Sequence, residues 1–182
     1  MSVASEELIE VRTAGVGSPV FDGDRELLGH VVMLDCDETT REEAVSEAER
    51  LDGPAVVVRS SERSHHVYGL AVGTWGNARA TMRSSPRCSR EFIDEMIERS
   101  RCTLRTHAKY SYDGDVVVDE PVPVAVVDGD ASSTSRPHAI RLRDLARERG
   151  EPEVAEQLVA SVAGTLVGET YSAARWSYEV SR

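Results

Sequence analysis

The chain has 182 residues and a mass of 19.9 kDa, which suits one compact domain with a sizeable core or two very small ones. It carries 32 acidic and 21 basic residues, for a formal charge of −11, and every basic residue except Lys109 is arginine. This acidic, lysine-poor composition is expected of a protein that works in concentrated salt, and it argues against a generic cationic binder of nucleic acid or membranes. The sequence shows no apolar run of transmembrane length, no signal-peptide pattern and only three widely spaced cysteines. Together these features predict a soluble, reduced, cytoplasmic protein.

The charge is distributed unevenly along the chain. Residues 1–58 carry 14 acids and 4 bases, residues 59–109 carry 5 acids and 10 bases, and residues 110–182 carry 13 acids and 7 bases. The acidic total therefore conceals a basic central segment. Solvated helix faces explain such a segment as well as an anionic ligand does, so charge alone does not indicate a function.

The first half of the chain has the pattern of alternating strands and helices. Residues 1–28 are predicted to form a short helix or strand and then a hairpin-like segment, and residues 29–34 form a buried strand. Thr39 and Thr40 are each followed by a glutamate three residues later, a capping-box pattern that begins a helix ending at residues 52–54. Residues 55–58 and 65–72 are predicted as two further strands in an antiparallel hairpin.

The second half mixes short strands with helices. A short arginine-bearing segment reaches Arg83, a loop covers residues 84–88, and a helix is predicted over residues 89–100. Residues 102–107 form a predicted strand, and prolines limit residues 122–127 to an edge strand. Two helices follow, one over about residues 138–149 and one from residue 152 onward.

Asp35 and Asp37 form the first group that could carry chemistry. Because side chains alternate along a strand, both carboxylates project from the same face near the end of the predicted strand. Two oxygen ligands held in this way are typical of Mg²⁺ or Mn²⁺ sites that also bind phosphates. Alternatively, these acids serve only the turn and the N-terminus of the following helix.

The second group lies where a polar turn enters the strand at residues 65–72. Arg63, Ser64 and the histidines offer hydrogen-bond donors for phosphate. His65 and His66 must face opposite sides of the strand, and His66 shares its face with Tyr68. The alternative is a half-buried structural strand with one solvated histidine.

The third group is Arg105, His107 and Lys109, which recur at a spacing of two residues. On one continuous strand they would present three cationic or polar donors on the same face, next to a phosphate or nucleotide. The alternative is an ordinary hydrophilic surface strand.

These three groups, in this order, resemble the archaeo-eukaryotic primase superfamily, in particular small plasmid- and virus-type members from halophilic archaea. The segments that match are Val32 to Asp37, Ser64 to His66, and the basic segment Thr103 to Lys109, so the resemblance covers about residues 29–110. It implies an α+β fold with an RRM-like β-α-β-β core, a mainly antiparallel sheet and C-terminal helices. The corresponding division is a catalytic core at residues 1–128, a linker at 129–137 and a helical segment at 138–182.

The resemblance also implies a metal-dependent nucleotidyltransferase that replicates a plasmid, virus or integrated element. Asp35, Asp37 and His66 would be its catalytic residues, with both aspartates binding Mg²⁺ or Mn²⁺. The family has a third acidic motif on a strand, for which Asp94 and Glu98 are the candidates, although both fall on a predicted helix. Nucleotides, a single-stranded template and replication proteins would be the partners, without a membrane. The nucleotide phosphates would be bound by Arg63, Ser64, His66, Arg105, His107 and Lys109.

Two alternatives stay open at this point. A catalytically inactive primase-like domain would bind nucleic acid or a replication partner without metal chemistry. An unrelated α+β protein would carry the same acids and histidines as surface residues. The hypotheses differ in whether five side chains converge on one cleft, namely Asp35, Asp37, His66, Arg105 and Lys109.

Overall fold

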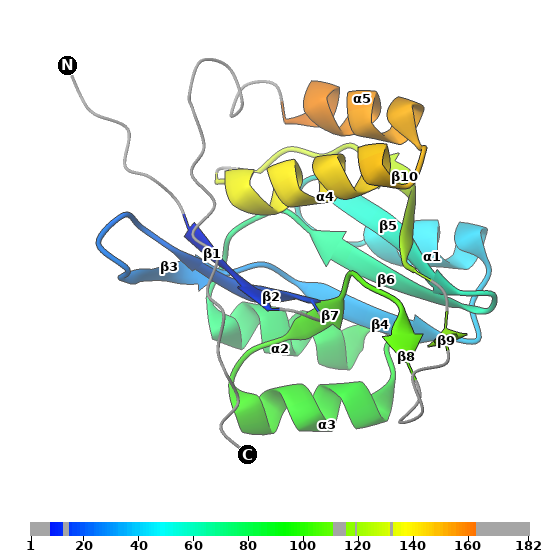
Figure 1. Cartoon of the computed structure of the whole chain (residues 1–182). Helices are drawn as coiled ribbons and strands as arrows, with labels where there is room; N and C mark the ends of the chain where they lie inside the picture. The colour runs from blue at the N-terminus through cyan, green and yellow to red at the C-terminus, as the bar shows by residue number, and fades with distance from the viewer. Residues whose placement is uncertain (1–7, 13–14, 111–115, 119, 132, 163–182) are drawn as a thin grey trace.

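A computed structural model describes residues 8–12, 15–110, 116–118, 120–131 and 133–162. Within these residues the chain is an α+β protein with five α-helices and antiparallel β-sheets (Figure 1). Among the described segments, no helix combines the length and the apolar character that a membrane crossing requires.

One of two four-stranded sheets, called here the central sheet, has the strand order β10-β5-β6-β4 with every neighbouring pair antiparallel. Its strands are β4 (Met33–Asp37), β5 (Ala55–Ser61), β6 (Ser64–Gly69) and β10 (Val122–Val127). Helix α1 (Arg41–Ala48) connects β4 to β5, and β5 and β6 form a hairpin. The predicted β-α-β-β order and the predicted edge position of residues 122–127 are therefore confirmed. Because β6 lies between β4 and β5, the strand that carries His66 is the direct neighbour of the strand that carries both aspartates.

A second sheet, called here the N-terminal sheet, is built around β2 (Gly15–Phe21). One side of β2 pairs with β1 (Leu8–Arg12), and the other pairs with β3 (Leu27–His30) and with β7 (Thr103–Arg105). Gly15 allows β7 to approach closely, since a Cβ atom there would lie 2.3 Å from the carbonyl oxygen of Leu104. Through this pairing β7 lies in contact with β4, and Arg105 is the last residue of β7.

Residues 29–34 do not form the single strand that their apolar pattern predicts. His30 ends β3, and Met33 begins β4 in the other sheet. Between them, the Val31 N–H donates to the Ser18 carbonyl in β2, whereas the Val32 carbonyl accepts from Gly69 at the end of β6. The run is uniformly apolar because its two halves are buried in two different sheets, and local sequence does not reveal that change of partner.

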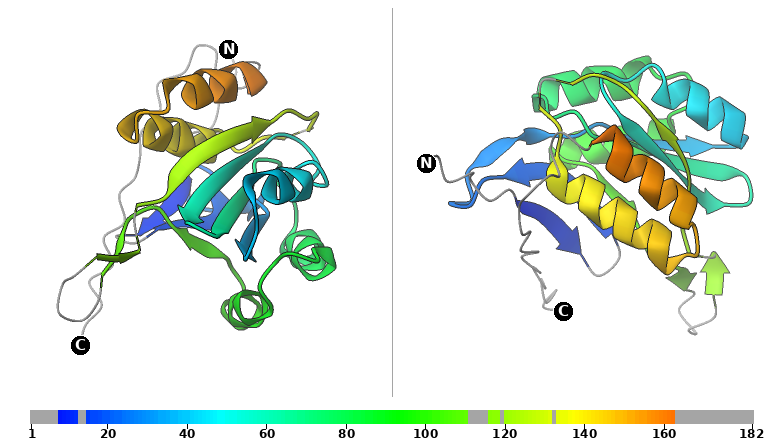
Figure 2. Two further views of the ribbon diagram at one scale, coloured as in Figure 1. Left: turned by 90° about the vertical axis from the view of Figure 1, so that its right-hand side faces the viewer. Right: turned by 90° about the horizontal axis from the view of Figure 1, so that it is seen from above.

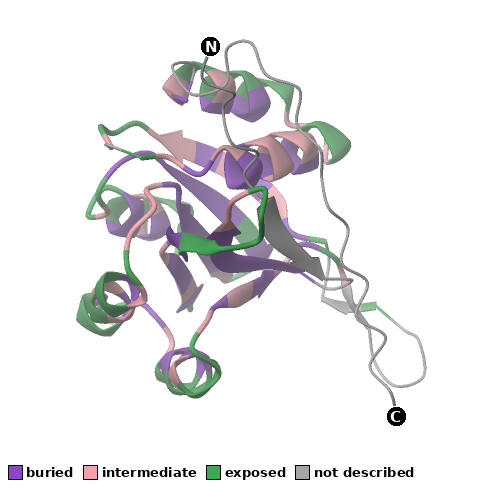
Figure 3. Cartoon of the chain, turned by 90° about the vertical axis from the view of Figure 1, so that its left-hand side faces the viewer, coloured by how far each residue is buried: buried purple, intermediate pink, exposed green. Residues whose placement is uncertain are grey.

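Helices cover both faces of the central sheet (Figures 1 and 2). Helix α1, α2 (Trp75–Ser84) and α3 (Arg90–Arg99) lie on one side, and α4 (Arg136–Glu148) and α5 (Pro152–Ser161) lie on the other. The sheet strands are mostly buried between these layers, while the outer faces of the helices are exposed (Figure 3). The sequence does not identify α2 as a helix, because Ala78 and Met82 are its only buried residues and leave little apolar periodicity.

Capping fixes the start of α1. The Thr40 hydroxyl accepts from the Glu43 N–H at 3.2 Å, and the Glu43 carboxylate accepts from the Thr40 N–H at 2.9 Å, which completes the predicted capping box. Thr39 has a different role, since its hydroxyl donates to the Cys36 carbonyl at 2.9 Å. The helix therefore begins at the end of β4, directly after Asp37.

The C-terminal helices pack on the central sheet. Both α4 and α5 contact β10, and Leu142 and Leu158 are buried in the same cluster of apolar side chains as the strands. In α4, His138 is fully buried and bonds to Ser135 and to the Gly17 carbonyl. These contacts tie α4 to both sheets.

Candidate functional site

Strands β4 and β6 bring four polar side chains to one face of the central sheet. In their antiparallel register Asp35 lies opposite His66, and Asp37 lies opposite Ser64. Paired residues share a face, and residues two apart along a strand do so as well. All four side chains therefore lie together on what we call the Asp35 face, and Tyr68 follows His66 on the same face.

Asp37 is the exposed member of the pair of aspartates, and Asp35 is half-buried. The Ser64 hydroxyl donates to Asp37 Oδ1 at 3.2 Å. Burial, followed by the nearby charge of Asp37, raises the pKa of Asp35 to about 6, and the positive charge of Arg105 only partly offsets this rise. A cation between the two carboxylates would remove the mutual repulsion that contributes to the raised pKa.

His66 is buried beneath the aspartates. Its Nε2 atom lies 3.5 Å from Asp35 Oδ1, but burial lowers the pKa of His66 to about 3, so the ring is neutral at physiological pH. The contact is therefore one between a neutral imidazole and a carboxyl group, and it is not an ion pair. Its Nδ1 atom is buried without a hydrogen-bond partner among the described residues.

Tyr68 is the residue that the sequence places on this face without assigning it a role. Its side chain is fully buried, its ring packs edge-on against His66 with centroids 6.3 Å apart, and burial raises the pKa of its hydroxyl. The hydroxyl oxygen also lacks a partner within the described part of the chain. Most buried polar atoms in proteins are hydrogen-bonded, so two such atoms on adjacent side chains are unusual. The only sequence signal for Tyr68 is its spacing of two residues from His66.

Arg105 reaches the same face from the N-terminal sheet. Its guanidinium donates to the Ser60 carbonyl and, at 3.1 Å, to the His107 carbonyl. It is close enough to Asp35 for the two charges to influence each other's pKa. The structure thus gathers Asp35, Asp37, Ser64, His66 and Arg105 in one place.

The remaining basic residues do not extend β7 as the sequence predicts. The chain leaves β7 after Arg105, and a separate strand β8 (Lys109–Tyr110) pairs with β9 (Val116–Val118). His107 lies between them, is exposed, and its Nδ1 atom is 3.1 Å from the Thr106 hydroxyl. The three residues therefore do not form one ladder, and the side chain of Lys109 lies outside the described residues.

Arg63 lies on the turn between β5 and β6 and forms an ion pair with Glu38. Both residues line a surface pocket of about 410 Å³ that also includes Arg59 and His65. His65 points away from the Asp35 face, and its Nδ1 atom is 3.2 Å from the Thr39 hydroxyl. The structure therefore groups Arg63 with His65 rather than with His66.

Asp94 and Glu98 are exposed residues of α3, which lies on the opposite side of the central sheet from the Asp35 face. Over residues 8–12, 15–110, 116–118, 120–131 and 133–162, no group of three or more His, Cys, Asp or Glu side chains has the spacing of a metal site. Among these residues, no third such side chain therefore joins Asp35 and Asp37 in a metal-binding group.

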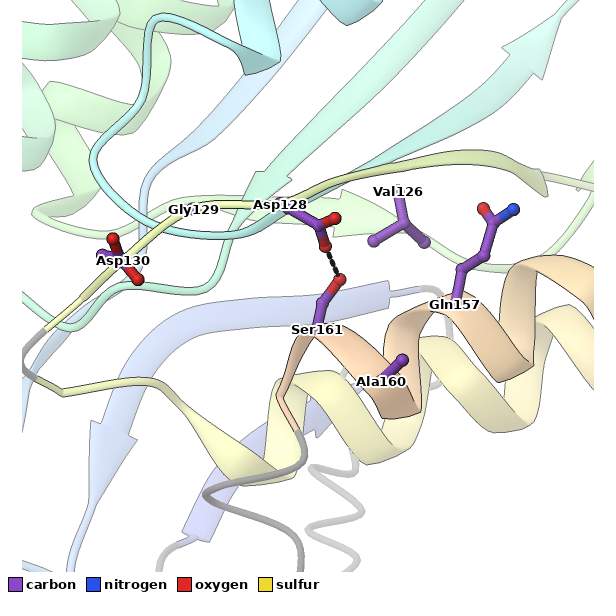
Figure 4. Close-up of a pocket in the computed structure, with 7 residues that line it drawn as sticks. All are labelled: Val126, Asp128, Gly129, Asp130, Gln157, Ala160 and Ser161. Carbon is purple, nitrogen blue, oxygen red and sulfur yellow. Dashed lines mark hydrogen bonds between the residues drawn. The ribbon is translucent and has the colours of Figure 1, made fainter.

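A pocket of about 800 Å³ lies between the end of β10 and α5, away from these residues (Figure 4). Asp128 accepts a hydrogen bond from the Ser161 hydroxyl at its wall, and Gln157 and Ala160 line it from α5. None of the side chains that the sequence nominates lines this pocket.

Comparison of the chain with protein-family models, with curated proteins and with solved structures gave no match.

Proposed function

We propose that the protein is a metal-dependent nucleotidyltransferase of the primase type, and that the Asp35 face is its active site. The observation that carries the proposal is the convergence of two carboxylates with His66 and Arg105 on neighbouring strands. Carboxylates beside a cation and neutral donors suit a magnesium-bound or manganese-bound nucleotide, whose phosphates are anionic and whose metal prefers oxygen ligands.

Asp35 and Asp37 are the residues that would hold the metal ion. Their donor set fits, because both are hard oxygen ligands on one face and because burial, followed by the charge of Asp37, raises the pKa of Asp35, a cost that a bound cation would offset. A bound divalent ion would supply charge stabilisation for the attacking hydroxyl and the triphosphate. The Ser64 hydroxyl holds Asp37 in position through its 3.2 Å hydrogen bond.

Arg105 would hold the phosphates, and His66 would position Asp35 from beneath. The Arg105 side chain is oriented by two carbonyl acceptors, so little conformational freedom remains to be lost when an anion binds. His66 is neutral, so it contributes no positive charge to the site. Its side chain is fixed by burial, which orients one ring nitrogen towards Asp35.

The strand order supports this proposal. An RRM-like core would place the third strand of a β-α-β-β unit between the first two, and β6 lies between β4 and β5. The fourth strand of the sheet, β10, pairs with the outer edge of β5. The opposite edge of the sheet is formed by β4, which carries Asp35 and contacts β7. We therefore extend the RRM-like description only to β4, α1, β5 and β6.

The alternative function is a catalytically inactive primase-like domain that binds nucleic acid or a replication partner. One observation favours it: within the described residues, no third carboxylate joins Asp35 and Asp37, and the two candidates are exposed on α3. Such a domain would bind DNA in a salt-dependent manner without requiring a divalent ion.

Two measurements on the full chain test the proposal. The first is nucleotide incorporation on a single-stranded template with Mn²⁺ or Mg²⁺ at high salt. The second is Mn²⁺ binding without nucleotide. The double variant Asp35→Asn plus Asp37→Asn is expected to lower incorporation by at least roughly 100-fold and to abolish Mn²⁺ binding, because it removes both charged ligands.

The matched control is Asp24→Asn plus Asp52→Asn, which removes the same charge from two exposed positions outside the site. It is expected to retain incorporation and Mn²⁺ binding. Equal activity of the two double variants would overturn the proposal. Metal-independent DNA binding with no incorporation by the wild-type chain would establish the inactive-domain alternative instead.

A further inference from the structure

Two buried cysteines flank the candidate site from the opposite face of β4. Cys36 lies in β4 between Asp35 and Asp37, and Cys88 lies in the loop between α2 and α3. Both are free thiols, with 0% and 4% of their surface exposed. No part of the proposed chemistry on the Asp35 face uses them, because the Cys36 side chain points the other way.

The backbone places these two residues directly opposite each other. Cys36 and Cys88 form an isolated antiparallel bridge at the outer edge of β4. The hydrogen bond at this bridge joins the neighbouring residues, since the Ser89 N–H donates to the Asp35 carbonyl at 2.7 Å. Cys36 and Cys88 are thus a non-hydrogen-bonded pair, the type in which Cα atoms approach to about 4.5 Å. Disulfides need Cα separations of roughly 4.4–6.8 Å, so this geometry admits one without a backbone shift.

We propose that Cys36 and Cys88 are a latent disulfide site, which a peroxide closes into a covalent bond between β4 and the α2–α3 loop. Each reaction consumes one hydrogen peroxide. After Cys88 loses its proton, its sulfur attacks one peroxide oxygen and becomes a sulfenic acid, and the other oxygen leaves as water after taking up that proton. The Cys36 sulfur then attacks the Cys88 sulfur and displaces its hydroxyl, which leaves as a second water with the Cys36 proton. The two thiols lose two electrons in total, and the peroxide is reduced by two.

Cys102 is the competing thiol, because it also lies close enough to Cys88 for the two to interact electrostatically, but it takes no part in the Cys36–Cys88 backbone bridge. Its backbone bonds to Ser18 in the N-terminal sheet, and its sulfur lies 3.3 Å from the sulfur of Met82. Among the described residues, the isolated bridges pair Cys88 with Cys36 and do not pair it with Cys102. The Cys88 N–H also donates to the Ser85 hydroxyl at 3.1 Å, which holds the loop in register with β4. The inference therefore concerns one specific pair, and it does not depend on the function proposed for the Asp35 face.

The test is oxidation of the folded full-length chain with hydrogen peroxide at alkaline pH, because burial raises the pKa of both thiols and the thiolate is the reactive form. Unfolding in an alkylating agent follows. The number of free thiols is expected to fall from three to one. Before alkylation, the mass of the oxidised chain should be lower by two hydrogen atoms, and dithiothreitol should restore all three thiols. Peptide mapping without reductant should show the segment containing Cys36 linked to the segment containing Cys88. The same oxidation of the unfolded chain should give mixed pairings, because the bridge geometry is then lost.

Two variants make the outcome specific. Cys102→Ala should lose both of its remaining thiols on oxidation, and Cys88→Ala should retain both. A link that involves Cys102, disulfides only between molecules, or three persistent thiols in the folded chain would each overturn the proposal. If Cys102→Ala does not fold, the peptide map of the wild-type chain still decides between the pairings.

Discussion

The two faces of the central sheet differ in how they treat buried polar groups. On the face covered by α1, each buried polar side chain among the described residues has a hydrogen-bond partner. The Thr39 hydroxyl donates to the Cys36 carbonyl and lies 3.2 Å from His65 Nδ1, and the buried Glu47 carboxylate accepts from the Ser85 hydroxyl at 2.6 Å. These polar contacts join α1 to β4, β6 and the α2–α3 loop.

On the Asp35 face, two buried polar atoms lack such partners. His66 Nδ1 and the Tyr68 hydroxyl are buried without partners among the described residues, and the pKa of Asp35 is raised to about 6. A buried polar group without a partner lowers stability, and such groups concentrate where a protein binds or reacts. The α1 face is therefore built for stability, whereas the Asp35 face keeps unused hydrogen-bonding capacity.

The largest stability effect is expected for Asp35→Asn. A carboxyl group whose pKa rises from 3.8 to about 6 on folding opposes folding once it ionises, by up to about 3 kcal/mol. Below pH 4 the carboxyl is protonated in both states and has no such effect, and stability is lost as the pH rises from about 4 to 6. The variant should therefore match the wild type near pH 4 and be more stable by up to about 3 kcal/mol at pH 7.

Urea denaturation of both proteins across this pH range checks the expectation. The control Asp24→Asn removes an exposed carboxylate from the turn between β2 and β3, and it should leave the pH profile of stability unchanged. An Asp35→Asn variant that is less stable than the wild type at pH 7 would mean that the Asp35 carboxylate contributes to folding. The two faces would then not differ as described.

The same contrast explains what the sequence could and could not predict. The α1 face is determined by local signals: the Thr40–Glu43 capping box and the hairpin of residues 55–69 were both predictable from spacing alone. The alternation rule also placed Asp35 with Asp37 and His66 with Tyr68. What the sequence could not reveal was which strands become neighbours, because pairing between β4 and β6, and the approach of Arg105 through β2, depend on contacts distant along the chain.

Two of the strand predictions made from the sequence were wrong for the same reason. The apolar run at residues 29–34 changes sheets at Val31 and Val32, and the spacing of Arg105, His107 and Lys109 is interrupted where β7 ends. In both cases a continuous pattern predicted a continuous strand, while tertiary hydrogen bonds divided it.

Glu47→Ala should give the next largest effect, in the opposite direction. The substitution leaves the buried Ser85 hydroxyl without its acceptor and weakens the link between α1 and the α2–α3 loop. Hydrogen bonds to a charged group contribute about 1.5–3 kcal/mol, so we expect a loss of about 2 kcal/mol in the free energy of unfolding. Urea denaturation at pH 7 measures it, with Glu49→Ala as the control because Glu49 is exposed at the end of the same helix. Equal stability of the two variants would contradict the prediction.

The smallest changes in stability are expected when one buried hydroxyl is removed from each face. Thr39→Val removes a hydroxyl that has two partners, and it should destabilise the protein by about 1 kcal/mol. Tyr68→Phe removes a buried hydroxyl that has no partner among the described residues, so it should leave stability unchanged or raise it by up to about 1 kcal/mol. Thermal and urea denaturation of the two variants, measured side by side, test the difference in sign. If Tyr68→Phe destabilised the protein as much as Thr39→Val, the Tyr68 hydroxyl would have a stabilising partner, and the Asp35 face would be as well satisfied as the face that α1 covers.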